Sequence, residues 1–448
     1  VIDGKQVPYI GIPSVVSPSL TWERVTTIDL GFDARFFNNE LGVSFDWYQR
    51  TTSDMHSPGE TLPSTFGSTT MPKVNSGELQ GRGFELSIDY NKRFACGLGL
   101  TARATLSKIR EKITKYNNPN KNIYGNYEGK IIGEIWGYET DRLFQYEDCY
   151  QDADGKWFID TNKVPSQALY ETGAFKYGPG DVKYKDLHGN GEITYGEQTL
   201  EDHGDLKRIG NTLPNFEYGF SVALTYKDFD FSTFFQGIGS RDVWAVGQTG
   251  IPGFMPGEGW LEHQMDYWTP ENTDAFYPTP TSHSWINNGQ NFLRQTRYLQ
   301  NMSYLRCKNI TLGYTVPEKW MKVITFTSGR IYVSAENLFE FDHTNIPVDP
   351  ETTEKAAASN GEYKFGKSYP FMRSIHLVFN LHSNKIMKTK IFAVLALAAG
   401  LSSCSDFLDR PPMDQIENSA DFYNSENNIR STIYGWYDIY FTGYQSGW

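Results

Sequence analysis

The chain has 448 residues and a formal net charge of −12 at pH 7, which leaves room for about two or three ordinary domains or for part of one large one. The acidic balance argues against a nucleic-acid partner, because such partners require a basic surface. The four cysteines show neither a CxxC spacing nor a pairing pattern, so they indicate neither a disulfide framework nor a zinc site. No window of about 18 apolar residues is present, but transmembrane strands bury only alternate residues and would leave almost no such signal.

Apolar and polar residues alternate with a period of two through most of the first 384 residues. The stretch LGVSFDWYQR, which begins at Leu41, shows the pattern clearly. Similar runs begin at Ile28, Phe84, Leu98, Phe220, Ile310, Ile331 and Ile375. Successive side chains of a strand point to opposite faces, so each run predicts a strand with one apolar face. Helical periodicity is almost absent there, and this section is therefore predicted to be all-β.

Strand length and loop length distinguish two all-β architectures: a soluble sandwich, with its apolar face inward, and a membrane barrel, with its apolar face toward lipid. Several runs reach about 9 to 11 residues, the span of a tilted transmembrane strand, and many end in an aromatic residue. Short connections follow Tyr90 and Tyr226, whereas residues 107–216 and 239–306 contain long ones. Short turns on one side and large loops on the other favour an outer-membrane barrel. A soluble β-rich surface adhesin or glycan-binding protein is the alternative.

Six tryptophans lie in the long connections. They are Trp136, Trp157, Trp244, Trp260, Trp268 and Trp285. As a set they suit glycan contact, because aromatic faces stack on sugar rings. For any single one of them, packing within the loops or at the membrane interface is the preferred interpretation. No residue of the sequence stands out as a substrate ligand.

The stretch DLHGNGEITYGE, which begins at Asp186, resembles a calcium-binding loop. Asp186, Asn190 and Glu197 stand at positions 1, 5 and 12 of the EF-hand pattern, and oxygen ligands on a tight glycine turn suit Ca²⁺. His188 at position 3 departs from the usual Asp or Asn, and no flanking helices are evident. A calcium site at Asp186, Asn190 and Glu197 is therefore one hypothesis, and a plain extracellular turn is the other. The sequence suggests no other cofactor.

Catalytic motifs are missing from the sequence. It contains no HExxH, GxSxG or P-loop pattern, and its eight histidines are scattered singly. The chain is therefore not expected to be an enzyme. Turnover of a polysaccharide would be needed to support the rival hypothesis of a secreted carbohydrate-active enzyme.

The stretch MKTKIFAVLALAAGLSSC, residues 387–404, has the three parts of a secretory signal peptide. Two lysines precede an apolar run, and small residues then lead into Cys404. The run is too short for a membrane helix, which needs about 20 apolar residues. The residues before Cys404 resemble the bacterial lipobox, which implies lipid attachment at the Cys404 thiol. Residues 405–448 continue as a polar tether and an amphipathic helical segment.

Several stretches resemble the barrel of SusC-type TonB-dependent transporters. They are IGNTLPNFEYGFSVAL from Ile209, DYWTPENTDAFYP from Asp266, TRYLQNMSYLRCKNITLGYTVP from Thr296, IYVSAENLF from Ile331 and YPFMRSIHLVFNL from Tyr369. The long stretch from Leu20 to Met55 and VNSGELQGRGFEL from Val74 look like earlier strands of the same barrel. The section after Met387 resembles the N-terminus of a SusD-type surface lipoprotein.

The resemblance implies a fold for each part of the chain. Residues 1–385 would be the C-terminal part of a large antiparallel transmembrane β-barrel, incomplete, with long extracellular loops. About ten to twelve strands are expected, roughly half of a 22-stranded barrel. Residues 387–404 would be the lipoprotein signal peptide. Residues 405–448 would be the N-terminal fragment of the nutrient-binding lipoprotein, a short helical tail.

The resemblance also implies a function. Transporters of this type import oligosaccharides, and sometimes peptides, across the outer membrane of Gram-negative bacteria. The SusD-type lipoprotein covers the barrel mouth as a hinged lid, and the TonB complex acts through a plug domain and a TonB box that this sequence lacks. Unpaired strand edges are costly in lipid, so the fragment is not expected to transport alone.

A joining of two reading frames explains a signal peptide behind a completed barrel better than a natural fusion does. Sequencing of the source DNA across the codons for Phe379 to Lys390 is expected to show a stop codon. An unbroken frame would instead mean a true fusion, and lipidation of Cys404 would then be the next question.

Overall fold

The computed structural model describes residue 17 and residues 20–382, apart from 61–62, 64, 66–70, 174, 255–258, 281–289, 324–325, 352–364 and 367–369. The chain divides into two units, Val1–His382 and Ser383–Trp448. The second unit lies outside the described residues, and with it the signal peptide, Cys404 and the helical tail. These three assignments stay predictions.

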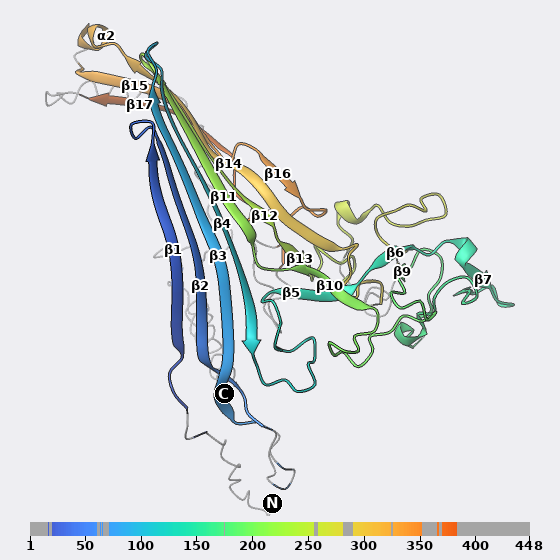
Figure 1. Ribbon diagram of the computed structural model, residues 1–448. Coiled ribbons are helices and arrows are strands. Elements are labelled where there is room, and N and C mark those ends of the chain that lie inside the picture. The colour runs from blue at the N-terminus through green and yellow to red at the C-terminus, as the bar shows by residue number, and fades with distance from the viewer. Residues whose placement is uncertain are drawn as a thin grey trace, which may run out of the picture. The chain divides into compact units, whose positions relative to one another are not determined.

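An 11-stranded antiparallel sheet holds the long strands of the described chain (Figure 1). Its order is β1 (Arg24–Phe36), β2 (Leu41–Pro58), β3 (Lys73–Arg93), β4 (Gly99–Lys115), β11 (Asn215–Tyr226), β12 (Phe229–Ser240), β14 (Leu299–Val316), β15 (Ser328–Glu336) and β17 (Ser374–His382). Two short strands, β13 (Asp242–Trp244) and β16 (Glu340–His343), pair with β14 outside this order. Within the described residues β1 and β17 stand at the two ends, so the sheet is a barrel wall that is not closed. The predicted all-β fold and strand number are confirmed.

The connections between the strands are short at one end of the sheet and long at the other (Figure 1). At the short end, β1 meets β2 and β11 meets β12 in tight turns, and α2 (Glu318–Val323) joins β14 to β15. None of the helices in the described ranges is long and apolar enough to cross a membrane. At the other end, residues 116–214 and 241–298 connect β4 to β11 and β12 to β14. This asymmetry matches the predicted division into short turns and long loops, and in outer-membrane barrels the long loops are the extracellular ones.

The register places apolar side chains of neighbouring strands side by side. One apolar row runs from β1 to β11 through Phe32, Phe45, Leu86, Leu106 and Tyr218. The neighbouring polar row runs through Asp33, Ser44, Ser87, Thr105 and Gly219. Because successive side chains point to opposite faces, the sheet has one apolar and one polar face. Large side chains stay exposed on the apolar face, among them Leu30 at 64% and Leu312 at 55%, as a surface against lipid requires.

The apolar belt, meaning the outward apolar side chains of all strands, crosses the rows diagonally. On β1 the last belt residue on the side of the short turns is Phe36. On β15 the last belt residue on the side of the long loops is Ala335. The register nevertheless places these two residues in one row, by way of Leu41, Tyr90, Ala102, Val222, Thr233 and Ile310. Barrel strands are tilted and staggered in this way, so the diagonal belt matches a barrel wall.

Residues 116–214 and 241–298 form a loop body with its own hydrophobic core. Its short elements are β5 (Glu134–Tyr138), β6 (Thr140–Leu143), β7 (Cys149–Gln151), β8 (Trp157–Ile159), β9 (Val182–Tyr184), β10 (Leu206–Asn211), η2 (Tyr146–Asp148), η3 (Ala168–Tyr170) and η4 (Glu262–Gln264). Trp136 and Trp268 are buried in this core, at 6% and 4% exposure. Three more tryptophans pack against it, namely Trp157, Trp244 and Trp260. Trp285 lies outside the described residues, so the packing interpretation holds for the other five.

Leu86→Arg is expected to lower the free energy of unfolding by about 2 to 4 kcal/mol, because it places a cation in the middle of the lipid-facing belt. Ser87→Arg, one residue away on the polar face, is the matched control and should change that free energy by less than about 1 kcal/mol. The measurement is urea unfolding of the protein in lipid vesicles. Equal losses for the two variants would contradict the assignment of the faces.

Candidate functional site

The polar face of the sheet carries a hollow of about 540 Å³ between β2, β3, β4, β11 and β12. Its charged lining consists of Asp46, Glu85, Arg103 and Glu217. Hydroxyl and amide groups also line the hollow, among them Ser44, Ser87, Thr105, Ser107 and Gln236, and apolar residues such as Phe234 complete the lining. Three carboxylates thus accompany one guanidinium. Such a wall can exchange hydrogen bonds with a hydrated polar solute, and its net negative charge disfavours an anion.

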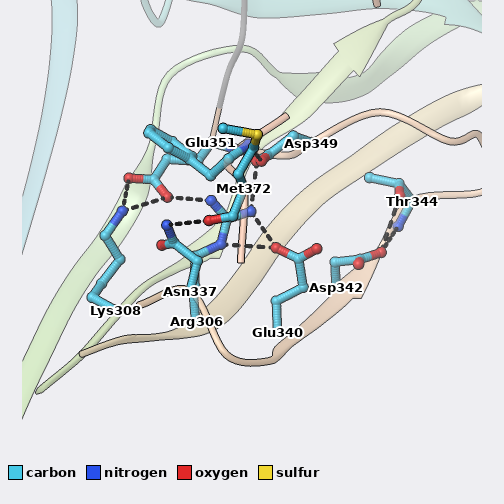
Figure 2. A network of polar contacts seen from close by, with 10 residues as sticks. Arg306, Lys308, Asn337, Glu340, Asp342, Thr344, Asp349, Glu351 and Met372 are labelled. Atoms are coloured by element: carbon cyan, nitrogen blue, oxygen red, sulfur yellow. Dashed lines mark hydrogen bonds and ion pairs between the residues drawn. The ribbon is translucent and has the colours of Figure 1, made fainter. Parts of the chain in front are cut away.

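A buried arginine on the same face anchors a loop to the sheet (Figure 2). Arg306 on β14 pairs in register with Gln236 of the hollow, and its side chain is only 2% exposed. Its guanidinium donates to three carboxylates, those of Glu340 at 2.8 Å, Asp349 at 2.7 Å and Glu351 at 2.8 Å. Glu340 lies on β16, and the other two belong to the connection between β16 and β17. One strand residue therefore holds part of a long connection against the wall.

An irregularity in β14 brings a second cation to the same place. The pairing of β12 with β14 passes from Cys307 directly to Asn309, so Lys308 has no partner on β12. An extra residue of this kind is a β-bulge, which re-aims a side chain. Lys308 Nζ lies 2.9 and 3.1 Å from the two carboxylate oxygens of Glu351. The centroid of the Phe371 ring lies 4.3 Å from the same nitrogen, which adds a cation–π contact.

We refer to Arg306, Lys308, Glu340, Asp349 and Glu351 as the Arg306 cluster. Its charges are costly to remove from water, so the cluster persists only because each charge is paired and hydrogen-bonded. Burial by itself raises the pKa of Asp349, but Arg306 and the N–H groups of Phe371 and Glu351 outweigh burial and hold that pKa below its usual range. Asp349 is therefore ionised at neutral pH, and its carboxylate holds the loop to Arg306 by electrostatic attraction.

The predicted calcium ligands lie in the connection between β9 and β10. The carboxylate of Asp186 accepts backbone N–H bonds from His188 at 3.1 Å, Gly189 at 2.6 Å and Gly191 at 2.8 Å. The Asn190 side chain accepts from the Glu192 N–H at 3.0 Å. Through these hydrogen bonds the side chains of Asp186 and Asn190 stabilise a turn of the backbone that follows them.

The third predicted ligand, Glu197, uses its own N–H to donate to the carboxylate of Asp202 at 3.3 Å. In the part of the chain that the structure describes, no group of three or more His, Cys, Asp and Glu residues is placed to hold a metal ion. A turn accounts for the Asp-Gly pattern by itself, and calcium binding at Asp186, Asn190 and Glu197 stays a prediction.

Sequence analysis did not single out the Arg306 cluster. Strict alternation from Ile310 and Leu312 would place Arg306 on the apolar face, and the bulge at Lys308 is what brings it to the polar face. Its carboxylate partners lie 34 to 45 residues further along the chain. A local signal does exist, because Arg306 and Lys308 are the charged residues of an otherwise uncharged strand. That signal gives no hint of which acids meet them.

Arg306→Ala is expected to lower the free energy of unfolding by about 3 to 5 kcal/mol, because it leaves three carboxylates without their buried partner. Arg330→Ala is the control. Arg330 pairs with Asp230 on a neighbouring part of the sheet, but the two side chains are 33% and 30% exposed, so the loss should be at most about 1 kcal/mol. Urea unfolding of both variants in lipid vesicles provides the comparison, and similar losses would show that the Arg306 cluster is not a buried anchor.

The stability that the Arg306 cluster gives to the connection should also depend on pH. Because the folded-state pKa of Asp349 is lowered, its contribution to stability is fully present above the ordinary aspartate pKa of about 3.9 and is lost as the pH falls through the lowered value. Protease cleavage within residues 337–373 should therefore be constant from about pH 7 to 5 and rise below about pH 4. Asp349→Asn should remove the acid-dependent rise, and a rise of unchanged size in that variant would contradict the assignment.

Comparison with known proteins identifies the fold. A family model described as TonB dependent receptor-like, beta-barrel matches residues 7–338. TonB-dependent receptor P3 of Formosa agariphila is 27% identical over 404 residues, which cover 85% of this chain and 36% of that protein. TonB-dependent receptor SusC of Bacteroides thetaiotaomicron is 24% identical over 341 residues, which cover 73% of this chain and 29% of that protein. This chain thus spans about a third of the length of the curated relatives that it matches.

A solved structure, that of the RagAB peptide transporter, shows the same fold. It superposes with a TM-score of 0.53 at 19% identity, over 83% of this chain and 36% of that one. The matching family is one of receptors and transporters, not a catalytic one. The resemblance to SusC-type barrels is therefore confirmed for the barrel. The chain belongs to the TonB-dependent receptor-like β-barrel family, whose members lie in the outer membrane of Gram-negative bacteria.

Proposed function

We propose that this chain forms part of an outer-membrane, TonB-dependent importer of oligosaccharides or peptides. The observation that carries the proposal is the two-faced wall, with the apolar belt on one side and a polar hollow of about 540 Å³ on the other. A wall of this kind separates lipid from a hydrated interior. Family membership and the similarity to SusC of Bacteroides thetaiotaomicron support the same function.

The chemistry of the hollow favours some nutrients over others. Its hydroxyl and amide groups can replace water around the hydroxyls of a sugar or the amides of a peptide at little net cost. The carboxylates of Asp46, Glu85 and Glu217 outnumber the Arg103 guanidinium, so the hollow should admit neutral or cationic solutes more readily than anionic ones. We therefore propose a neutral glycan or an uncharged to basic peptide as the cargo.

The proposed partners are a SusD-type lipoprotein over the barrel mouth and the TonB complex. Support for a docking platform comes from the loop body, whose two connections are tied together. Asn291 donates to Asp181 at 2.8 Å and accepts from the Val182 N–H at 2.8 Å. The Tyr177 and Tyr184 hydroxyls donate to the carbonyl of residue 290 at 3.2 and 2.6 Å. Such cross-links give the mouth of the wall a fixed shape against which a lid could close.

The soluble adhesin proposed as the alternative fits less well. A soluble sheet must bury its apolar face, but the belt residues Leu30, Leu312 and Leu377 are 64%, 55% and 61% exposed. An exposed apolar surface of that extent would drive aggregation in water. The family match independently favours the membrane protein.

The test is growth of the source bacterium with the full-length gene deleted. We expect loss of growth on at least one class of oligosaccharide or peptide as sole nutrient, with growth on monosaccharides intact. Restoration by the wild-type gene, together with co-purification of a surface lipoprotein, would support the importer and its lid. Unchanged growth on every oligosaccharide and peptide class would contradict the proposal.

The charge of the hollow can be tested in the same strain. Glu85→Gln with Glu217→Gln should weaken the preference for neutral and basic cargo over anionic cargo, as measured by competition for uptake of a labelled nutrient. Ile88→Leu on the apolar belt is the control and should leave uptake and preference unchanged. An unaltered preference in the double variant would rule out the hollow as the selective wall.

A further inference from the structure

Cationic side chains lie on the outward face where the apolar belt ends toward the extracellular loops. On β3 the belt ends at Phe84, and Arg82 follows on the same face. On β4 the belt ends at Leu106, and three further outward residues follow, namely Lys108, Arg110 and Lys112. The register places Phe84 beside Lys108 and Arg82 beside Arg110. The four cations therefore form one patch directly above the belt.

The patch brings positive charges close together and contains no acidic side chain. Arg82 and Arg110 are direct cross-strand neighbours, an arrangement that destabilises a sheet unless a counter-charge is present. Arg82 donates to the Gln49 side chain at 2.9 Å, and Lys108 Nζ lies 4.3 Å from the centroid of the Phe216 ring. Within the described ranges of the chain, Arg82, Lys108, Arg110 and Lys112 form no ion pair with a carboxylate.

The nearby carboxylates, as far as the structure describes them, form no ion pair with these four cations. A hollow of about 320 Å³ beside Lys108 and Arg110 is lined by Glu111 and Glu134 as well. Glu134 accepts from the Trp136 indole at 3.0 Å, and Glu111 pairs in register with Gly81 on the polar face. By contrast, Lys115 at the end of the same strand has its own carboxylate, Glu78, at 2.8 Å. None of the carboxylates that the structure describes supplies the counter-charge of the patch.

We propose that Arg82, Lys108, Arg110 and Lys112 bind the phosphate groups of an anionic lipid in the outer leaflet, whose acyl chains lie on the apolar belt below. Neighbouring side chains across the strands are about 5 Å apart and alternate ones along a strand about 7 Å apart, so several of them can reach one phosphorylated headgroup. Guanidinium groups bind phosphate oxygens in pairs of parallel hydrogen bonds.

The position of the patch indicates a lipid as the occupant and not a small anion. The first outward residues beyond the belt meet lipid headgroups at the membrane surface. Phe84, Leu86 and Leu106 continue directly below the cations on the same face and supply the apolar surface that acyl chains need. The inference depends on the outer-membrane location of the family and not on the proposed cargo.

The experiment compares lipid binding by the purified full-length receptor and its variants. The probes are diphosphoryl lipid A, the same lipid without its phosphates, and inorganic phosphate, each titrated into detergent-solubilised receptor. We expect diphosphoryl lipid A to bind at least about tenfold more tightly than the dephosphorylated form. Removal of each cation should cost about fivefold, so Arg82→Gln with Arg110→Gln should weaken binding by about 25-fold.

The matched control is Arg50→Gln. Arg50 directly follows Gln49 on β2 and pairs with Gly81, so it lies at the same height on the polar face. Arg50→Gln removes one positive charge, half of the loss in the double glutamine variant, and should keep wild-type lipid affinity. Arg82→Lys with Arg110→Lys should keep that affinity within about threefold. Folding of every variant is checked by its shift in gel migration on heating. If the double glutamine variant fails to fold, Lys108→Gln with Lys112→Gln takes its place and should lose about 25-fold as well.

Three results would overturn the proposal. The wild-type receptor could bind the two lipid forms equally, which would remove any role for phosphate. Arg50→Gln could weaken binding as much as the double variant, which would make the effect one of net charge. Millimolar inorganic phosphate could displace the lipid completely, which would make the patch a site for a free anion.

Discussion

The structure depends on one constraint: in lipid, every backbone N–H and C=O of a spanning segment must find its partner within the protein. Antiparallel pairing satisfies that constraint, and the pairing in turn fixes which side chains stand side by side. Because side chains alternate along each strand, one register is enough to carry an apolar face from Phe32 on β1 through Leu86 on β3 to Leu106 on β4. The polar hollow and the cationic patch above the belt are consequences of that same register.

The loop body and the connection after β15 are stabilised by other interactions than the strand pairing of the sheet. The loop body has a conventional aromatic core around Trp136, Tyr184 and Tyr277. The connection after β15 is fixed by a smaller apolar cluster, in which its Ile346 and Phe365 are buried with Met302. The Arg306 cluster, in which buried charges compensate one another, holds the same connection as well. The bulge at Lys308 and the guanidinium of Arg306 allow β14 to hold this connection against the sheet.

The sequence predicted those features that are local. Period-two alternation is visible in any ten residues, so the strands, the two-faced wall and the division into short turns and long loops could all be derived from it. The Arg306 cluster could not, because its members are brought together by a turn and a bulge whose register no local pattern encodes. The tryptophans are an intermediate case: their position in the loops was evident, but whether Trp268 faces a core or a solute depends on contacts with residues far along the chain. For Asp186 the pattern suits both a turn and a metal site, and the backbone hydrogen bonds of the structure already satisfy its carboxylate.

The central claim is that neighbouring residues of each strand face opposite media. The most direct measurement is a cysteine scan of β3 from Phe84 to Asp89 in the full-length receptor, with exposed Cys96 replaced by serine and with a water-soluble thiol reagent applied to intact outer membranes. The account predicts that cysteines at Glu85, Ser87 and Asp89 react and that those at Phe84, Leu86 and Ile88 react only after detergent is added. Uniform reactivity along the six positions, or a pattern with another period, would contradict it.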